Sequence, residues 1–317
     1  MAKICADGWI CCYIISKISD IPLFMEPTAS LSGVGTALIT PFDRNGHIDF
    51  KALERVVAYI TERQTDFIVV LGTTGEAPTL SAAEKQALCQ AVVDLNGGRL
   101  PLVLGVGGND TAAVAERCAR LPEGFDYVLS VAPYYNKPGQ AGLFAHYQTV
   151  AAASPKPVIV YNIPSRTGVN VETATLLRLA NEVKGIAGVK EASGNLRQID
   201  DLLARRPKGF AVFSGVDALT VPLLCLGGDG VISTSANFMP EVFKRMVEAV
   251  RQGRLEEARA CHFKALPLIR LFFEEGNPVG IKAALHHIGL CENILRLPLV
   301  EASADLSRRI ASAVRPA

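Results

Sequence analysis

Residues 67–106, FIVVLGTTGEAPTLSAAEKQALCQAVVDLNGGRLPLVLGV, predict a strand, a helix and a second strand in succession. The apolar runs at 67–72 and 102–106 are continuous, which is typical of parallel strands covered on both faces. Between them, the spacing of apolar residues predicts an amphipathic helix over 82–94. Ser81 and Glu84 match the capping box that begins such a helix.

The same pattern repeats along the chain. The predicted strands cover residues 34–42, 67–72, 102–106, 127–132, 158–162, 186–190, 211–214 and 230–233. Amphipathic stretches lie between them, for example at 50–62 and at 111–120, where Asp110 or Thr111 can cap the helix. After residue 239 the sequence predicts helices only. Eight strand–helix repeats are the number in a TIM barrel, an α/β fold that we prefer here to a doubly wound sheet.

We therefore expect a (β/α)8 barrel over residues 31–250 and a small C-terminal helical region over residues 251–317. The length of 317 residues also allows two smaller domains, but no linker or composition shift divides residues 31–317. Residues 1–30 hold three of the eight cysteines and the only tryptophan. Their apolar patch is too short to span a bilayer, which takes about twenty residues, and no signal-peptide cleavage site follows it. We expect a dispensable extension there, with a short interfacial or partner-binding segment as the alternative.

Charge and cysteine content limit the function classes. The chain has 32 basic and 31 acidic residues and a net charge of +1, so neither nucleic acid nor a membrane is an expected partner. The eight cysteines lack zinc-ligand spacing, and scattered buried thiols predict a cytoplasmic protein. The five histidines lie away from the strand ends, so we expect no metal site and no histidine triad. Residues 105–110 lack the third glycine of a dinucleotide loop, so we expect no nicotinamide cofactor.

Several predicted strands end in polar residues, and the active site of a TIM barrel lies at these carboxyl ends. GTTGE at 72–76 combines glycines with hydroxyls and amides that can face an anion such as a carboxylate. An ordinary tight turn explains this motif equally well. PYYN at 133–136 places two phenols at the same rim, although a tyrosine pair is commonly a packing feature.

The fifth and sixth strands carry the strongest chemical signals. YNIPSRTG at 161–168 places a phenol at the strand end and Arg166 on the next loop, where a guanidinium can bind a carboxylate or pair with a neighbouring acid. Lys190 lies inside an apolar strand. Burial disfavours the charged amine and favours a nucleophile suited to Schiff-base chemistry. A rim lysine paired with Glu191 is the alternative, but strand alternation sends the two side chains to opposite faces.

The motifs GTTGE (72–76), PYYN (133–136), YNIPSRTG (161–168), VKEAS (189–193) and GVIS (230–233) occur in this order. The combination resembles the dihydrodipicolinate synthase and N-acetylneuraminate lyase family, from about residue 33 to the C-terminus. The late segments EGNP (275–278) and LPL (297–299) belong to the same resemblance. It implies a TIM-barrel lyase without metal or organic cofactor, assembled as a homotetramer from two tight dimers.

The resemblance also implies which residues react. Lys190 would form an imine with pyruvate. Tyr161 would donate and accept protons, in a relay with Thr73 and Tyr135. Tyr135 would reach across the tight dimer into the neighbouring subunit. A protonated imine is an electron sink that acidifies the pyruvate methyl group, and a chain of hydroxyls can carry the accompanying protons without a histidine.

The substrates follow from the same resemblance. Thr74 and Ile232 would hold pyruvate, with Thr74 near its carboxylate, and Arg166 would receive the carboxylate of L-aspartate 4-semialdehyde. Arg166 and the double threonine favour the synthase branch, which produces 4-hydroxy-tetrahydrodipicolinate for diaminopimelate and L-lysine biosynthesis. The alternative is another pyruvate-dependent aldolase, such as an N-acetylneuraminate or keto-deoxy sugar acid lyase. A catalytically silent barrel would be expected to lose Lys190 or Tyr161, and both are present.

One departure from the family concerns regulation. Lysine-inhibited relatives place His and Glu in a pocket at the tight dimer interface, where this chain has Lys85 and Ala113. Asn109 and Tyr134 fit that pocket. Losing the acidic partner of a lysine amine removes a contact of roughly 1.5 to 3 kcal/mol, and Lys85 adds repulsion. We therefore expect weak or absent lysine feedback.

Overall fold

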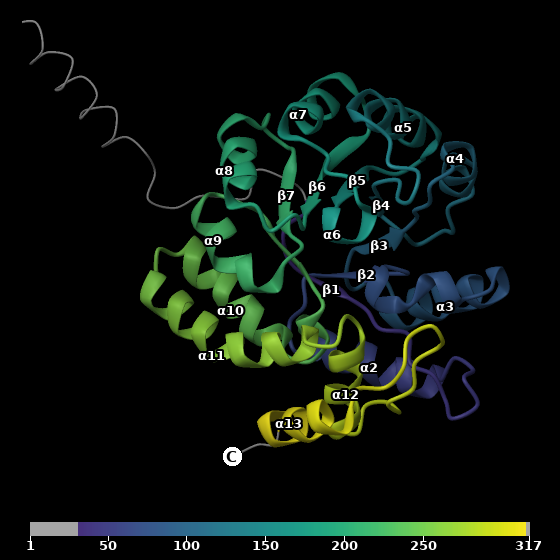
Figure 1. Cartoon of the computed structure of the whole chain (residues 1–317), viewed down its shortest axis with the longest axis vertical. Helices are drawn as coiled ribbons and strands as arrows, with labels where there is room; N and C mark the ends of the chain where they lie inside the picture. Colours follow the sequence, from purple (N-terminus) through teal and green to yellow (C-terminus); the bar gives the residue numbers. More distant parts are fainter. Residues whose placement is uncertain (1–30, 315–317) are drawn as a thin grey trace, which may run out of the picture.

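A closed barrel of eight parallel strands forms the centre of the molecule in the computed structural model, which describes residues 31–314 (Figure 1). The strands are β1 (Gly33–Ala37), β2 (Phe67–Val70), β3 (Leu102–Gly105), β4 (Tyr127–Val131), β5 (Val158–Asn162), β6 (Ile186–Glu191), β7 (Ala211–Ser214) and β8 (Gly230–Ser233). Each strand pairs with the next in chain order, and β8 returns to β1. The predicted TIM barrel is confirmed. The expected extension over residues 1–30 lies outside the described residues.

Helices surround the barrel (Figure 1). The main ones are α2 (Phe50–Glu62), α3 (Ala82–Asn96), α4 (Thr111–Ala119), α5 (Gln140–Ala153), α7 (Thr173–Glu182), α8 (Leu196–Arg205), α9 (Thr220–Cys225) and α10 (Pro240–Arg251). Single turns follow several strands: η1 (Thr73–Gly75), η2 (Ala77–Thr79), α6 (Pro164–Thr167), η3 (Asp217–Leu219) and η4 (Ser235–Asn237). The predicted capping box of Ser81 and Glu84 begins α3, and Asp110 caps α4 by accepting a hydrogen bond from Ala112 N.

The C-terminal region contains α11 (Leu255–Phe273), α12 (Val279–His287) and α13 (Ala304–Val314), which pack on one another in sequence. Residues 288–303 are irregular, so the prediction of helices only after residue 239 is wrong for this segment. Its main-chain oxygens are bound by side chains from elsewhere: Lys282 Nζ donates to Ile294 O at 2.8 Å, and Arg55 Nε donates to Leu290 O at 3.3 Å. Pro298 has no N–H for a helix to use.

The strand predicted over 34–42 is also too long. Strand β1 ends at Ala37, Leu38 N makes one more hydrogen bond to Val69 O of β2 at 3.0 Å, and Ile39 N then donates to Asn237 Oδ1 at 3.1 Å. Pro41 cannot donate to a neighbouring strand. The apolar run continues beyond the strand because the loop side chains remain buried, as Ile39 and Phe42 show.

The core has two layers, one inside the barrel and one between the strands and the helices. The inner layer includes Phe67, Val69, Val103, Leu129, Ile159, Tyr161, Phe213 and Ile232. The rings of Phe67 and Phe213 meet edge to face at 5.5 Å between centroids, a favourable aromatic geometry. A Cβ on Gly35 would overlap the Phe67 ring, so the filled interior depends on a glycine at that position. Side chains fill the barrel and leave the strand ends to form a site.

Candidate active site

Lys190 and Tyr161 lie side by side because β5 and β6 are paired at these two residues. The Lys190 amine is 4.3 Å from the centre of the Tyr161 ring, and both side chains are buried. Glu191 faces the other way, where its carboxylate accepts hydrogen bonds from Asn162 Nδ2 at 2.9 Å and Gln198 Nε2 at 3.0 Å. The lysine therefore has an aromatic ring beside it, and within residues 31–314 no carboxylate forms an ion pair with it.

The end of β7 provides the space that this lysine occupies. A Cβ on Gly215 would lie 3.1 Å from both Cγ and Cε of Lys190 and 2.7 Å from the Ala192 side chain. An alanine at position 215 would have to displace the lysine or the neighbouring backbone. Gly215 thus makes room for the Lys190 side chain.

Thr73 and Tyr161 line one cavity of about 60 Å³ at the ends of β2 to β5. The other residues around it are Leu71, Gly72, Gly105, Val106, Gly107, Leu129 and Val131. The structure thus brings a hydroxyl from the GTTGE turn and the phenol from β5 to one opening. Ile232 is buried in the same inner cluster as Tyr161, on β8.

Thr74 is buried beside Thr73, and its hydroxyl points away to other partners. Its Oγ1 lies 3.1 Å from Thr234 Oγ1 and accepts a hydrogen bond from Asn277 Nδ2 at 3.1 Å. The two threonines of the turn therefore face different neighbours. This arrangement is compatible with one hydroxyl in a proton relay and the other on a carboxylate.

Tyr135 stands apart from the other candidate residues. Its side chain is 87% exposed and its φ is 72°, a left-handed conformation that is uncommon for a bulky residue. Within the described chain, its hydroxyl makes no hydrogen bond. One chain alone does not bring Tyr135 to Tyr161 and Thr73. A strained, exposed aromatic side chain is typical of a position that another molecule covers.

Arg166 lies on α6 with an exposed side chain at the same end of the barrel. Its Nη2 donates to the main-chain oxygen of Asn277 at 3.5 Å. Among residues 31–314, no acidic side chain pairs with its guanidinium, so the alternative of a neighbouring acid is wrong. The guanidinium is available for a carboxylate from outside the chain.

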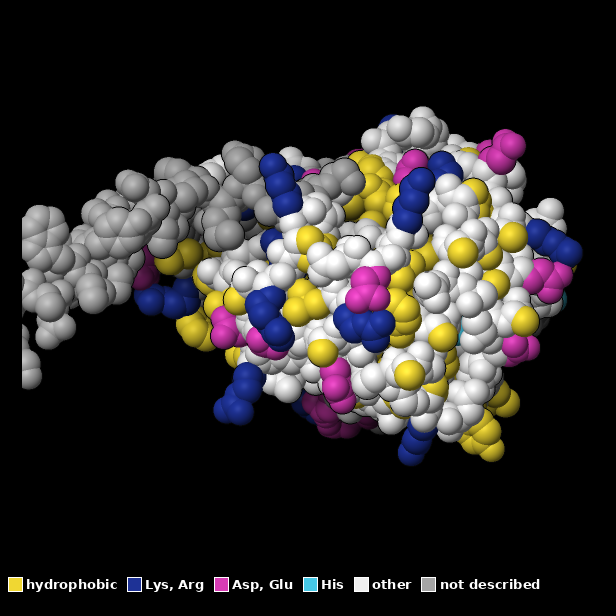
Figure 2. All heavy atoms as spheres, turned by 90° about the horizontal axis from the view of Figure 1, so that it is seen from above, with side chains coloured by type: hydrophobic (Ala, Val, Ile, Leu, Met, Phe, Trp, Pro, Cys, Tyr) yellow, Lys and Arg dark blue, Asp and Glu magenta, His cyan; other side chains and the backbone are white. Residues whose placement is uncertain are grey.

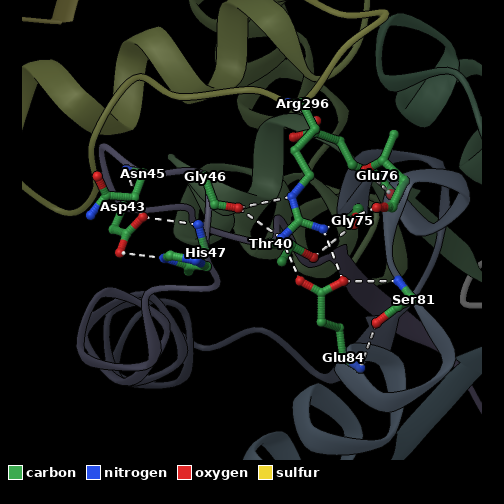
Figure 3. A network of polar contacts seen from close by, with 11 residues as sticks. Thr40, Asp43, Asn45, Gly46, His47, Gly75, Glu76, Ser81, Glu84 and Arg296 are labelled. Carbon is green, nitrogen blue, oxygen red and sulfur yellow. Dashed lines mark hydrogen bonds and ion pairs between the residues drawn. The ribbon is translucent and has the colours of Figure 1, made fainter.

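Glu76, the last residue of the GTTGE motif, belongs to a network that the sequence analysis missed. Its buried carboxylate pairs with Lys282, which is fully buried, and accepts a hydrogen bond from Arg296 N at 3.1 Å. The Arg296 guanidinium also binds Gly46 O and the carboxylate of Glu84 (Figure 3). This contact lowers the pKa of Glu84 to about 2. The C-terminal region thereby anchors the turn that carries Thr73 and Thr74.

Asp217 is a second buried carboxylate that was missed. It follows β7, and its Oδ2 accepts a hydrogen bond from Ser235 N at 2.8 Å. Burial raises its pKa, while hydrogen bonds from Ser235 and Ser233 and the charge of Lys190 act in the opposite direction. Its place just beyond the end of the seventh predicted strand was the available signal, because polar residues at strand ends form the site of a barrel.

The surface charges and most of the described cysteines match the expectations drawn from composition, which are a balanced charge and buried thiols. Figure 2 shows a face on which basic and acidic side chains are interspersed with apolar ones. Cys89, Cys118 and Cys291 are buried free thiols, whereas Cys225 is exposed, against expectation. Of the helices in residues 31–314, none is both long enough and apolar enough to cross a membrane.

Comparison with known proteins identifies the family. The model of the Dihydrodipicolinate synthetase family matches residues 30–317. The 4-hydroxy-tetrahydrodipicolinate synthase of Flavobacterium psychrophilum is 46% identical over 279 residues, covering 88% of this chain and 95% of the relative.

Two solved structures share the fold over nearly their whole length. The chloride-inhibited dihydrodipicolinate synthase of Acinetobacter baumannii, complexed with pyruvate, has a TM-score of 0.87 at 35% identity and covers 90% of this chain and 98% of that one. The enzyme of Cyanidioschyzon merolae with lysine bound has a TM-score of 0.84 at 39% identity and covers 89% and 96%. Because the family model spans the barrel and the C-terminal helices, the chain belongs to the dihydrodipicolinate synthetase family.

Proposed function

We propose that this chain acts as a 4-hydroxy-tetrahydrodipicolinate synthase, which condenses pyruvate with L-aspartate 4-semialdehyde. The observation that carries the proposal is the buried amine of Lys190, 4.3 Å from the Tyr161 ring and without an ion-pair partner within residues 31–314. A buried amine held next to a phenol is suited to imine formation with a keto acid. The name of the Flavobacterium psychrophilum relative supports the choice of reaction.

The reaction follows from the chemistry of an imine. The Lys190 amine adds to the pyruvate carbonyl, and water leaves to form the protonated imine. The imine withdraws electrons from the methyl group, which loses a proton and becomes the nucleophilic carbon of an enamine. This carbon attacks the aldehyde carbon of the semialdehyde. The substrate's own amino group then displaces Lys190 from the imine carbon, which closes the ring and frees the enzyme.

Protons move at several of these steps, and we assign their transfer to hydroxyl groups. Tyr161 donates and accepts the protons, and Thr73 on the shared cavity continues the relay. Tyr135 completes it from a second copy of the chain, which accounts for its exposure in a single chain. Hydroxyls within hydrogen-bonding reach of one another pass protons without a net change in charge. No metal ion or organic cofactor is required for these steps.

Three further residues bind the substrates in this proposal. Thr74 donates a hydrogen bond to the pyruvate carboxylate, and Ile232 provides an apolar contact from the barrel interior. Arg166 binds the carboxylate of the semialdehyde, for which its guanidinium is free of an acidic partner among the described residues. A guanidinium that forms two parallel hydrogen bonds discriminates between a carboxylate and a sugar hydroxyl.

We also propose that four chains assemble as a pair of tight dimers. Large apolar side chains are exposed on α8, at the end of α9 and on α11: Leu196, Leu226 and Phe263. Helix α9 contacts both α8 and α11, so the three side chains lie on neighbouring elements. Exposed apolar groups on adjoining helices are typical of a subunit interface. Sedimentation of Phe263→Asp, which should form smaller assemblies than the unaltered chain, tests this proposal.

The remaining organisation is proposed as well. Residues 31–250 make up the barrel unit and 251–317 the helical region, and the protein works in the cytoplasm, where free thiols persist.

The family model begins at residue 30, which supports a dispensable extension before it. A chain started at Met25 should therefore fold and react like the full chain, and loss of either property would contradict this view.

Mass spectrometry of the product tests the main proposal. Pyruvate is incubated with L-aspartate 4-semialdehyde in one reaction and with N-acetylmannosamine in another, with Lys190→Ala as the blank. We expect turnover of the semialdehyde alone, and none in the blank. Turnover of the sugar would assign the chain to the lyase branch and refute the role of Arg166.

A further inference from the structure

Asn277 connects two residues that the proposed function assigns to different substrates. It lies between α11 and α12, in the C-terminal region, yet it reaches the mouth of the barrel. Its Nδ2 donates to Thr74 Oγ1 at 3.1 Å, and its main-chain oxygen accepts a hydrogen bond from Arg166 Nη2 at 3.5 Å. The groups proposed for the carboxylates of pyruvate and of the semialdehyde are thus bridged by a single asparagine.

The direction of the hydrogen bond to Thr74 determines what its hydroxyl can do. An amide N–H can only donate, so Thr74 Oγ1 is the acceptor in this contact. The hydroxyl hydrogen therefore points elsewhere, toward Thr234 Oγ1 at 3.1 Å or toward a bound ligand. A hydroxyl that already accepts a hydrogen bond is a better donor, because neighbouring bonds polarise one another.

Asn277 has no competing hydrogen bond for its side chain. Its Oδ1 is buried and, within residues 31–314, has no donor. The bond to Thr74 is therefore the only one that this side chain makes in the described chain. The orientation of the amide is set by that contact and by packing, which is the arrangement expected of a group that holds another in place.

We propose that Asn277 is a positioning residue that keeps the Thr74 hydroxyl turned as a hydrogen-bond donor toward the carboxylate of pyruvate. Its main chain supports Arg166 at the same time, so one segment aligns both carboxylate sites. The proposal rests on the proposed function, because it assumes the roles given above to Thr74 and Arg166. It adds a residue from outside the barrel to the pyruvate site.

The substitution Asn277→Asp tests the proposal with almost no change in size. A carboxylate can only accept, so it would draw the Thr74 hydroxyl to itself and place a negative charge near the pyruvate carboxylate. We expect the KM for pyruvate to rise about tenfold or more, as for the loss of one charge-assisted hydrogen bond. The KM for the semialdehyde should change by less than about twofold, because the main-chain oxygen that binds Arg166 remains.

A double-mutant cycle with Thr74→Val separates positioning from a general structural role. Without the Thr74 hydroxyl, Asn277→Asp has nothing to misdirect and acts through its charge alone, so the combined rise in the KM for pyruvate should be smaller than the product of the two single effects. Effects that multiply in the double variant would overturn the proposal. An unchanged KM for pyruvate in the single variant would do the same. If Asn277→Asp does not fold, Asn277→Ala enters the same cycle with the same expected outcomes.

Two controls complete the design. Asn293→Ala removes another asparagine of this region whose Oδ1 is buried without a partner, and it should leave both KM values unchanged. Borohydride reduction in the presence of pyruvate, followed by mass measurement, reports the imine on Lys190. An unaltered chain that traps no pyruvate refutes the proposed function itself. Normal trapping by the unaltered chain together with normal KM values in the Asn277 variants refutes only the inference.

Discussion

His146 on α5 is a buried imidazole whose environment disfavours a charge. Its Nδ1 lies 2.9 Å from Thr111 Oγ1 on α4, and its Nε2 is buried without a partner in the described chain. Burial lowers its pKa to about 4, below the ordinary value of about 6.5. Since the folded protein then binds fewer protons than the unfolded chain, folding stability falls as the pH drops from about 6.5 to about 4.

We predict that His146→Gln reduces this loss, because glutamine can bond to Thr111 without acquiring a charge. The shift corresponds to about 3 kcal/mol at most. Urea unfolding of the unaltered chain and of His146→Gln at pH 7, 5.5 and 4 measures this loss of stability. A third protein, His47→Gln, changes an exposed histidine and is the control. Equal pH dependence in all three proteins would refute the prediction.

Lys85 on α3 and Ala113 on α4 determine the second prediction at the residue scale. The Cyanidioschyzon merolae relative was solved with lysine bound. In this chain the resemblance predicts a pocket in which Ala113 replaces the acidic partner of the lysine amine and Lys85 adds a positive charge. Lysine should therefore inhibit weakly or not at all. Activity assays with added lysine measure this, and Ala113→Glu combined with Lys85→His should increase the inhibition. Inhibition of the unaltered enzyme by sub-millimolar lysine would contradict the prediction.

At the scale of elements, the Glu76–Lys282 pair joins α12 to the turn after β2. Both side chains are buried. Burial lowers the pKa of Lys282, and the neighbouring Glu76 carboxylate opposes that shift. We predict that Lys282→Met destabilises the protein by about 3 to 5 kcal/mol, because it leaves an unpaired charge in the core.

A double variant tests whether the unpaired charge causes this loss of stability. Glu76→Gln combined with Lys282→Met removes both charges and should recover much of the lost stability. The exposed pair of Arg178 and Glu182 at 3.1 Å is the control, and Arg178→Met should cost less than about 1 kcal/mol. Guanidinium unfolding measures all four proteins, and similar losses for Lys282→Met and Arg178→Met would exclude the proposed cause.

Local features of the elements could be predicted from the sequence. The capping box at Ser81 and the opposite directions of Lys190 and Glu191 depend only on residues a few positions apart, and both are confirmed. The length of β1 could not be predicted, because it depends on an acceptor at Asn237, 198 positions away. Buried apolar loops and buried strands look alike in a sequence.

Candidate site residues on or just after the strands could also be predicted from the sequence, whereas those from the C-terminal region could not. Lys190 and Tyr161 lie near the ends of β6 and β5, and Thr73 follows β2. The order of strands in a barrel brings these ends together. Asn277 and Lys282 reach the site from the C-terminal region, and the contact between Asn277 and Thr74 spans 203 positions. No local pattern reports such a contact. Its chemistry becomes visible only when the helices are placed around the barrel.

At the scale of the whole molecule, the exposed Tyr135 predicts that two chains share one active site. Tyr135→Phe loses the proposed relay donor, and Lys190→Ala loses the proposed nucleophile, so each variant alone should be nearly inactive. Mixed dimers should regain one complete site, because the Lys190→Ala chain supplies Tyr135 to its neighbour. Random mixing should restore up to about one quarter of the normal activity per chain.

The experiment requires co-refolding or co-expression of the two variants and an assay of the separated species. The control is a mixture of Tyr135→Phe with the double variant that carries both substitutions. No dimer in this mixture can bring an intact Tyr135 to an intact Lys190. Absence of any recovery in the mixed species would show that Tyr135 acts within its own chain or not at all.

The pairing of Glu76 with Lys282 also has a consequence for how the protein is made. These residues are 206 positions apart, and the last strand ends at Ser233. A ribosome therefore releases all eight strands before it adds Lys282, and the nascent chain can begin to close its barrel. Until Lys282 is added, the Glu76 carboxylate in the turn beside Thr74 lacks the cation that pairs with it in the folded protein. A chain terminated before Lys282 would therefore hold every residue proposed to react, yet its lower stability would expose it to degradation.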